Sequence, residues 1–206
     1  MFNQNQQQNQ QQQSSTHMPQ EQQFGAHELM EAHEAIGAVV GGLEHFVLYE
    51  QHVQDQELSG IMQRQKTFMT QMYNTILDTL KSGKDPAVKT QTYLMEENNT
   101  TIFGTKPSSP KTPIQSVNEL NDECISGFIL GHLKSIASSF TLTALEASNP
   151  VLRRIFADSI PNVIEMAYEI YLYQNKNQYY QVPQLSQQDM QAVINEHAPI
   201  QGNMPH

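Results

Sequence analysis

The 206-residue sequence predicts an all-α protein, a four-helix bundle made of two antiparallel helical hairpins. Apolar residues recur at spacings of three and four over four long segments, which is the period of an amphipathic helix. Helix-capping residues separate the segments within each half, at Asp55 and at Asn149-Pro150. A long segment with several prolines separates the two halves. Each hairpin has an apolar face that needs a partner, and the other hairpin is the nearest candidate.

The first hairpin is predicted to consist of helices over about residues 27–54 and 56–81. Asp55 fits the N-cap of the second helix, and Ser82-Gly83 supplies a C-terminal stop. We expect each helix to bury one apolar stripe. The stripe of the first helix comprises Leu29, Ile36, Val40, Leu43 and Val47, and that of the second comprises Leu58, Ile61, Met62, Phe68, Met69, Met72, Ile76 and Leu80.

The third helix is predicted to open near Ser116, because Ser116 and Glu119 fit the S-x-x-E capping box, with Asn118 as a competing cap. It should continue to about Ala147. Two apolar stripes run along it, and a helix with two apolar faces is expected to be buried on two sides. One stripe comprises Leu120, Cys124, Phe128, Leu142 and Leu145, and the other comprises Ile129, Leu133, Ile136 and Phe140.

The stretch EASNPVLRRIF interrupts the helical pattern and lets it resume at once, which is typical of a corner between two helices. The Asn149 side chain can accept backbone N–H bonds as an N-cap, and Pro150 suits the first helical position, where its missing N–H would have no partner. We therefore expect a fourth helix from here to about Gln174, kinked at Pro161. Its apolar face comprises Leu152, Ile155, Phe156, Ile160, Val163, Ile164, Ala167, Tyr168 and Tyr171.

The connection between the two halves determines the topology. Residues 82–118 include GTKPSSPKTP, whose prolines and small polar residues exclude a continuous helix. Helices of roughly 25 residues are about 37 Å long, and an extended chain spans that length with on the order of a dozen residues. The segment is therefore long enough to cross the bundle. A long connection between the second and third helices is typical of a ferritin-like bundle, whereas an up-down-up-down bundle needs a short loop.

These signals divide the chain into five parts. Residues 24–82 are predicted to form the first hairpin, 83–115 the Pro-rich crossover linker and 116–182 the second hairpin, followed by a polar C-terminal tail over 183–206. In residues 1–23, eleven are glutamine, and so little is apolar that we expect this leader to be disordered.

The composition excludes several classes of function. A formal net charge of −10 and a pI near 5.1 argue against nucleic acid as a partner, because phosphate binding needs clustered Lys and Arg. No stretch approaches the roughly 18–20 uninterrupted apolar residues of a membrane span. The N-terminus lacks the pattern of a signal peptide, so we expect the chain to be made in the cytoplasm and to remain there. The single cysteine, Cys124, is expected to be a small buried residue, with an intermolecular thiol role as the alternative.

Ferritin-like architecture raises the hypothesis of a di-iron enzyme, whose site needs Glu-x-x-His on two helices and a Glu on each of the others. No Glu-x-x-His occurs in the chain. The nearest candidates could bind a divalent ion if they converged, but we favour the alternative that they are solvated flank positions of amphipathic helices. Because nucleophile, oxyanion and phosphate-loop patterns are also absent, we assign no catalytic, cofactor-binding or metal-binding residue. The candidates are His45, Tyr49 and His52 on the first helix and Glu165 and Glu169 on the fourth.

Three features of residues 120–183 are distinctive in their order and spacing: LNDECISG at the start of the third helix, the corner ASNPVLRRIF, and the aromatic-rich ending at Tyr179-Tyr180. With these features the segment resembles the spore coat protein F (CotF-like) family of endospore-forming bacteria, and the first hairpin looks like a weaker copy. The resemblance implies a ferritin-like helical bundle located in the spore coat, with other coat proteins as partners, synthesis in the mother-cell cytoplasm and no established catalytic residues. The Gln-rich leader and the long linker depart from the lean form of the family.

Two functions are therefore expected. The preferred one is a structural, non-enzymatic component of the spore coat that assembles through helical faces and polar tails, with a homo-oligomer left open. The alternative is a metal-binding ferritin-like protein or an oxidase with an atypical site. Tyrosines near the end of the fourth helix, like the leader glutamines, could be cross-linked. We favour instead that Tyr168 and Tyr171 are core residues and that the others, Tyr173, Tyr179 and Tyr180, are surface aromatics.

Overall fold

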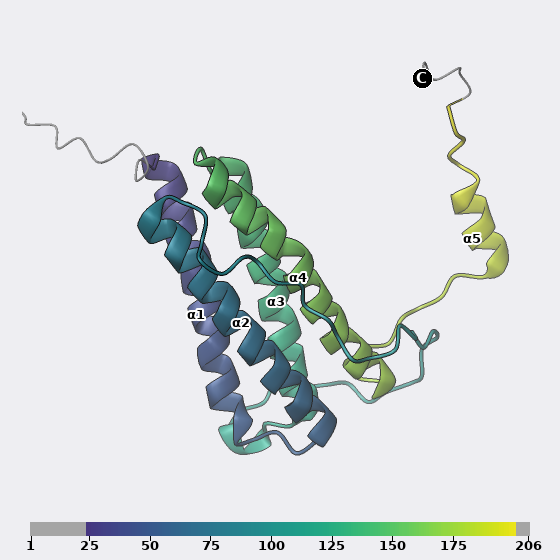
Figure 1. The fold of residues 1–206 in the computed structure, drawn as a ribbon. Helices are drawn as coiled ribbons and strands as arrows, with labels where there is room; N and C mark the ends of the chain where they lie inside the picture. The colour runs from purple at the N-terminus through teal and green to yellow at the C-terminus, as the bar shows by residue number, and fades with distance from the viewer. Residues whose placement is uncertain (1–23, 201–206) are drawn as a thin grey trace, which may run out of the picture.

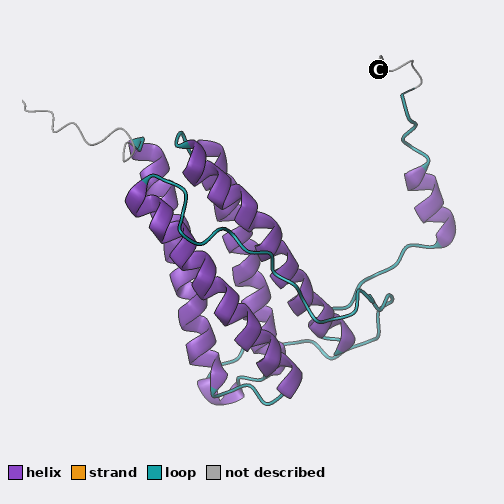
Figure 2. Ribbon diagram, viewed as in Figure 1, coloured by secondary structure: helices purple, strands orange, loops and turns teal. Residues whose placement is uncertain are grey.

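The computed structural model describes residues 24–200, and the regular secondary structure of this part of the chain is helical (Figure 2). Four long helices form a bundle, a one-turn 3₁₀ helix precedes the third of them, and a short helix follows the fourth. In chain order these elements are α1 (Ala26–Glu50), α2 (Gln56–Ser82), η2 (Val117–Glu119), α3 (Asp122–Glu146), α4 (Pro150–Lys176) and α5 (Gln187–Ile194).

The helices are arranged as two antiparallel hairpins, α1–α2 and α3–α4, joined by residues 83–121, which run along the bundle across α2 and α4 (Figure 1). Contacts at both ends establish this order. The Asp122 side chain, at the start of α3, accepts a hydrogen bond of 3.0 Å from Gln54 N, and Glu146, at its end, lies 3.1 Å from His27 at the start of α1. The predicted all-α bundle with a long crossover is confirmed, and its connectivity is the one expected of a ferritin-like bundle.

The capping residues predicted at both corners are in place. Asp55 accepts a hydrogen bond of 2.8 Å from Glu57 N and caps α2. Two backbone N–H groups in the first turn of α4 donate to Asn149 Oδ1, each at 3.0 Å, and Pro150 is the first residue of that helix. Gly83 ends α2 with a φ of 69°, a left-handed conformation that glycine adopts without steric cost.

Replacing Asn149 with alanine is expected to lower the free energy of unfolding by about 1 kcal/mol, because two N–H groups in the first turn of α4 lose their acceptor. Urea unfolding followed by circular dichroism measures the change. Asn99, which is exposed in the crossover, provides a matched control: its replacement with alanine should cost less than about 0.5 kcal/mol. Equal losses in the two variants would contradict the assigned cap.

The start of α3 differs from the prediction. Ser116 and Glu119 do form a local pair, in which Ser116 Oγ donates to Glu119 Oε1 at 3.3 Å, but this pair closes the 3₁₀ turn η2. Leu120 then adopts an extended ψ of 132°, which breaks the helical path. The N-cap of α3 is Asn121, whose side chain accepts a hydrogen bond of 3.0 Å from the third residue of the helix. Neither Ser116 nor the competing candidate Asn118 caps the long helix.

The core lies between the four long helices, and α1 contributes a different stripe to it from the one predicted. Leu29 and Val47, assigned to the core from the sequence, are exposed. The inward stripe consists mainly of small residues, which bring α1 close to its neighbours: a Cβ added at Gly42 would lie 2.7 Å from Met69 Cε on α2. Close helix packing therefore selects the small-residue stripe over the larger aliphatic one. The buried apolar residues of α1 are Ala32, Ala35, Val39 and Phe46.

On α3, one of the two predicted stripes is buried and the other is at the surface. Phe128, Leu142 and Leu145 are 46 %, 49 % and 80 % exposed. Cys124, predicted to be a small buried residue, is half-buried beside them and has a free thiol. The expectation that α3 is buried on two sides is therefore wrong for the single chain. The buried stripe comprises Ile129, Leu133, Ile136 and Phe140.

By length and composition alone, α3 is apolar enough to span a membrane, although the sequence predicted no span. Core helices of soluble proteins meet the same criterion. The buried side of α3 packs against α1 and α4. The core accounts for the apolar character of this side and leaves the exposed apolar residues of the other side unexplained.

Helix α4 continues through Pro161 and ends at Lys176, two residues beyond the predicted end, and the kink at Pro161 stays a prediction. Much of its predicted apolar face is buried, but Ile164 is exposed. The buried side of α4 is interrupted by polar residues. These are Ser159, Asn162, Glu169, Gln174 and Asn175.

The C-terminal tail contains a helix that the sequence reasoning missed. Ser186 caps α5 by accepting a hydrogen bond of 3.1 Å from Asp189 N, so the signal was a Ser-x-x-Asp pair in a stretch judged to be polar tail. Met190, Val193 and Ile194 are exposed on α5, which stands apart from the bundle (Figure 1). The expected disorder of the leader concerns residues 1–23, which lie outside the described residues.

Candidate functional site

The carboxylate of Glu169 on α4 is fully buried and lies between α2 and the crossover. Arg64 of α2 donates from Nη2 to its Oε1 at 2.7 Å, and Gln65 donates from Nε2 to its Oε2 at 3.0 Å. From the crossover, the Tyr93 hydroxyl donates to Oε2, and Glu96 N donates to Oε1 at 3.3 Å. Three segments that are far apart in sequence converge on one carboxylate. We call these five residues the Glu169 network.

Burial of this carboxylate is compensated by a cation and by several hydrogen-bond donors. Arg64 also pairs with Glu96, with 2.8 Å between Nη1 and Oε2. Burial alone would lower the pKa of Arg64, but the hydrogen bond and the charge of Glu169 outweigh it and raise that pKa. Burial also raises the pKa of the Tyr93 hydroxyl, and the carboxylate raises it further, so the phenol keeps its proton and remains a donor. The network therefore holds the crossover against α2 and α4.

Two asparagines of α4 bind the main chain of the crossover on either side of the Glu169 network. Asn162 accepts a hydrogen bond from Tyr93 N at 2.8 Å and donates to Gln91 O at 2.9 Å. Asn175 accepts from Ile102 N at 2.6 Å and donates to Ile102 O at 3.0 Å. A carboxamide presents one acceptor and one donor group, which match the two hydrogen-bonding groups of an extended main chain. Three buried side chains of α4, those of Asn162, Glu169 and Asn175, thus anchor the crossover.

The sequence reasoning did not identify these anchors, although a signal was present. Ser159, Asn162 and Glu169 are spaced by three and seven residues and so lie on one side of α4, among positions where a core helix carries apolar residues. Buried polar side chains almost always have partners. The pattern could have shown that another segment packs on α4, but not which segment.

The candidate metal ligands are not brought together in the structure. His45 lies where α1 meets α3, whereas Glu169 lies between α4 and α2, where a guanidinium and an amide already occupy its oxygens. In residues 24–200 there is no group of three or more His, Cys, Asp or Glu side chains placed to hold a metal ion. These residues do not fit the di-iron donor set. Of the remaining candidates, His52 lies in the turn after α1 and Glu165 is half-buried on α4.

His45 takes part instead in an aromatic contact between α1 and α3. Its ring stacks on Tyr49, with 5.5 Å between centroids, and meets the edge of His132 on α3 at 5.0 Å. His132 Nε2 lies 2.8 Å from Ala38 O, which fixes the ring against α1. Burial lowers the pKa of His45, and the neighbouring His132 lowers it further. The three rings therefore act as packing groups at this seam.

A second buried carboxylate, Glu28 near the start of α1, binds the corner between α3 and α4. It is 1 % exposed and accepts hydrogen bonds from Ser148 N at 2.6 Å, Ser148 Oγ at 2.7 Å and Asn149 N at 2.9 Å. Gly25 N donates to it as well, at 2.6 Å. Burial alone would raise the pKa of Glu28, but these hydrogen bonds outweigh it and lower the pKa below its ordinary value of 4.5. The first hairpin thus holds the corner of the second.

The buried carboxylate of Glu28 is expected to make a pH-dependent contribution to the free energy of unfolding. Because its pKa is lower in the folded state, the contribution is complete above the unfolded-state value and is lost as the pH falls through the folded-state pKa. At about pH 7, Glu28→Gln is expected to cost about 1–3 kcal/mol of unfolding free energy, since buried donors lose a charged acceptor. The difference in unfolding free energy between the unchanged protein and Glu28→Gln should become smaller below pH 4.5. Urea midpoints of both proteins across the pH range would measure this difference. A difference in unfolding free energy that does not change with pH would contradict an ionised Glu28 in the folded protein.

The tyrosines divide differently from the prediction. Tyr173, expected at the surface, is fully buried, and its hydroxyl donates to Asp55 Oδ2 at 3.1 Å. Tyr168 and Tyr171, expected in the core, are half-buried and stack on each other with 5.6 Å between centroids. Tyr180 is exposed and meets the Tyr171 ring at 5.3 Å. Of the tyrosines near the end of α4, Tyr173 therefore belongs to the core, and Tyr168, Tyr171 and Tyr180 form a partly exposed group.

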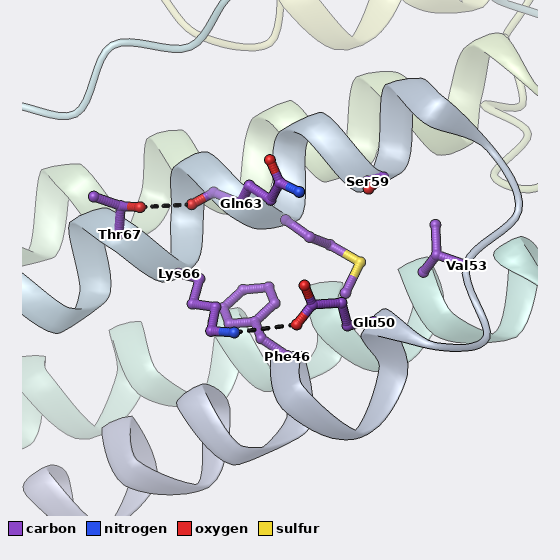
Figure 3. A pocket seen from close by; sticks show the side chains of 8 residues that line it. Phe46, Glu50, Val53, Ser59, Gln63, Lys66 and Thr67 are labelled. Atoms are coloured by element: carbon purple, nitrogen blue, oxygen red, sulfur yellow. Dashed lines mark hydrogen bonds and ion pairs between the residues drawn. The ribbon is translucent and has the colours of Figure 1, made fainter.

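A surface cavity of about 250 Å³ opens where α1 and α2 meet near their corner (Figure 3). Its polar groups bond to one another: Lys66 Nζ lies 3.2 Å from Glu50 Oε2, and Thr67 Oγ1 donates to Gln63 O at 2.9 Å. Neither histidine nor cysteine lines it. The lining residues are Phe46, Glu50, Val53, Ser59, Met62, Gln63, Lys66 and Thr67.

Comparison with known proteins identifies relatives of this bundle. Residues 121–183, which contain α3, the corner and α4, match the Coat F domain. Over 181 residues the chain is 45% identical to the spore coat protein F-like protein YhcQ of Bacillus subtilis (strain 168), covering 88% of this chain and 83% of that protein. The crystal structure of a candidate spore coat protein from Bacillus halodurans C-125 matches with a TM-score of 0.59 and 12% identity, covering 82% of this chain and 99% of the other. That second likeness concerns the fold.

The class of protein follows from these matches together with the anchored bundle: the chain is an all-α bundle that contains a Coat F domain. The identity to the Bacillus subtilis protein extends well beyond that domain, over 181 residues. The chain belongs to the spore coat protein F-like family. The resemblance inferred from LNDECISG and ASNPVLRRIF is confirmed.

Proposed function

We propose that this chain is a structural, non-enzymatic component of the bacterial endospore coat. The observation that carries the proposal is the 45% identity, over 88% of the chain, to a spore coat protein F-like protein. The chain is made in the cytoplasm of the mother cell and joins the coat through its helical faces and its polar ends, with other coat proteins as neighbours.

The use of buried charge supports the non-enzymatic part of the proposal. A catalytic carboxylate has to be accessible to a substrate. Glu169 and Glu28, in contrast, are 0 % and 1 % exposed, and their oxygens bind the crossover and the α3–α4 corner. Both groups therefore stabilise the fold.

Localisation tests the proposed function. The chain, fused at its C-terminus to a small epitope, would be followed by immunoblotting of vegetative cells, mother-cell cytosol, spore coat extract and spore core. We expect the protein in the coat extract of purified spores and in the mother cell during sporulation. Recovery mainly from vegetative cytosol, or from the spore core, would overturn the proposal.

Deleting residues 1–23 is expected to leave helix content and melting temperature nearly unchanged, because the glutamine-rich composition has too little apolar surface to offset the entropy of ordering. The deletion should, however, make the protein easier to extract from spores with detergent and reductant, since glutamine side chains can donate and accept many weak bonds with neighbouring chains. Immunoblots of successive extracts measure retention. Equal retention of both forms would show that the leader is an inert tail and that attachment comes from the helical faces.

A further inference from the structure

The crossover covers one side of the bundle, over α2 and α4, whereas α1 and α3 meet on the other side (Figure 1). Large apolar residues are exposed on that other side. Met30 and Leu48 of α1 are each 59 % exposed, and Phe128 and Leu142 of α3 are 46 % and 49 % exposed. With two small residues between these ends, they form what we call the α1–α3 face: Met30, Gly41, Leu48, Phe128, Ser135 and Leu142.

Helical spacing places these residues along two parallel lines. Phe128, Ser135 and Leu142 follow each other at intervals of seven residues, about two turns, so they share one side of α3. On α1, the steps from Met30 to Gly41 and Leu48 are eleven and seven residues, about three and two turns.

Ring and backbone contacts show that the two lines adjoin. The rings of Tyr49 and Phe128 are 6.0 Å apart, and a Cβ at Gly41 would lie 3.6 Å from His132 Cε1. The two lines are therefore parts of one continuous surface.

The outward side of α3 lacks the charges that a solvated helix side normally carries. Between Glu123 and Glu146, the formally charged residue is Lys134, and its ammonium lies on the α4 side, 5.6 Å from the centre of the Tyr180 ring. Apolar and small residues that recur along an exposed helix side with a seven-residue repeat are typical of a seam that packs on a further helix. The exposed apolar stripe of α3, with Phe128, Leu142 and Leu145, is therefore left largely uncovered by the other helices of residues 24–200.

We propose that the α1–α3 face binds the same face of a second copy of this chain in a two-fold symmetric dimer. The face has apolar ends and a centre of small residues, so a two-fold rotation can place apolar ends on apolar ends and lets the helix backbones approach at the centre. Glu34, seven residues before Gly41, adds an exposed carboxylate between Met30 and Gly41. When the two copies lie antiparallel, the Glu34 carboxylate of one copy and that of the other lie toward opposite ends of the interface.

The size of the face matches what a dimer needs. Two helices of 25 residues, each about 37 Å long and about 10 Å wide, present roughly 750 Å². A standard protein interface buries about 800 Å² on each partner. Helix α5, which also has an exposed apolar side, is a poorer match for the face. Its eight residues span about 12 Å, which is about a third of the length of α1 or α3. A membrane is disfavoured because a chain of net charge −10 is repelled by anionic lipid surfaces.

The test uses the purified full-length chain, analysed by light scattering after gel filtration over a range of concentrations. We expect a mass of twice the 23.4 kDa chain. Leu142→Glu and Phe128→Glu introduce a charge that the dimer would bury, and each should raise the dimer dissociation constant at least about 100-fold. Ile164→Glu changes an aliphatic side chain on α4 that is 55 % exposed and outside the face, and it should leave the dimer intact. Circular dichroism verifies that the variants remain helical.

Each alternative has its own result. A full-length chain that is monomeric at about 100 μM, a concentration far above the dissociation constant of a stable interface, overturns the proposal. So does a dimer that persists in both face variants, because another surface then forms it.

If deletion of residues 1–23 or 184–206 converts a monomer into a dimer, the deleted segment covers the face instead. Co-sedimentation of a monomeric chain with phosphatidylglycerol vesicles, lost in Leu142→Glu, would identify a membrane surface. Because the proposal concerns the purified protein, it does not depend on the location of the chain in the spore.

Discussion

Replacing Glu169 with alanine is expected to lower the free energy of unfolding by about 3–5 kcal/mol, the cost of removing one partner from a buried ion pair. Arg64 Nη2 loses an acceptor at 2.7 Å, and Gln65 and Tyr93 lose the oxygen to which both donate. The crossover also loses the central one of its three buried anchors on α4. Urea unfolding followed by circular dichroism measures the loss of stability.

The matched control is Glu165→Ala, which removes the same chemical group one turn earlier on α4, at a half-buried position outside the Glu169 network. Its cost should stay near about 0.5 kcal/mol. A second measurement reports on the crossover itself. Lys89 is exposed two residues before the anchored main chain, and trypsin should cleave after it faster in Glu169→Ala than in the control. Equal urea midpoints and equal cleavage rates would show that Glu169 does not hold the crossover.

The elements of the bundle could be predicted because their signals are local. Asp55 and Asn149 each accept hydrogen bonds from backbone groups two or three residues away, so a short stretch of sequence contains both the cap and the groups that it binds. The crossover followed from its prolines and its length. The error at Ser116 has a local cause too, since the same residue pair can close a 3₁₀ turn when the next residue is extended.

The anchors could not be predicted because their partners are distant in sequence. Arg64 and Glu169 are 105 residues apart, and Glu28 binds Asn149 across 121 residues. Nothing near either carboxylate indicates which backbone or cation it will meet. The choice of stripe on α1 was non-local for the same reason, because the Gly42 side faces inward to suit Met69 of another helix. Periodicity finds the possible faces of a helix, and packing selects among them.

Replacing Phe156 with alanine is expected to lower the free energy of unfolding by about 3–5 kcal/mol, which combines lost apolar burial with the cavity left behind. Phe156 is fully buried on α4 and meets the edge of the Phe140 ring on α3, with 5.2 Å between centroids and 74° between planes. This contact joins the two helices of the Coat F domain near the Asn149 corner. In a chain of this size the loss corresponds to a fall of about 10 °C in melting temperature.

Leu94→Ala, at an exposed position of the crossover, is the control and should shift the melting temperature by about 1 °C. Similar melting temperatures for the two variants would mean that α3 and α4 are not joined through this pair of rings.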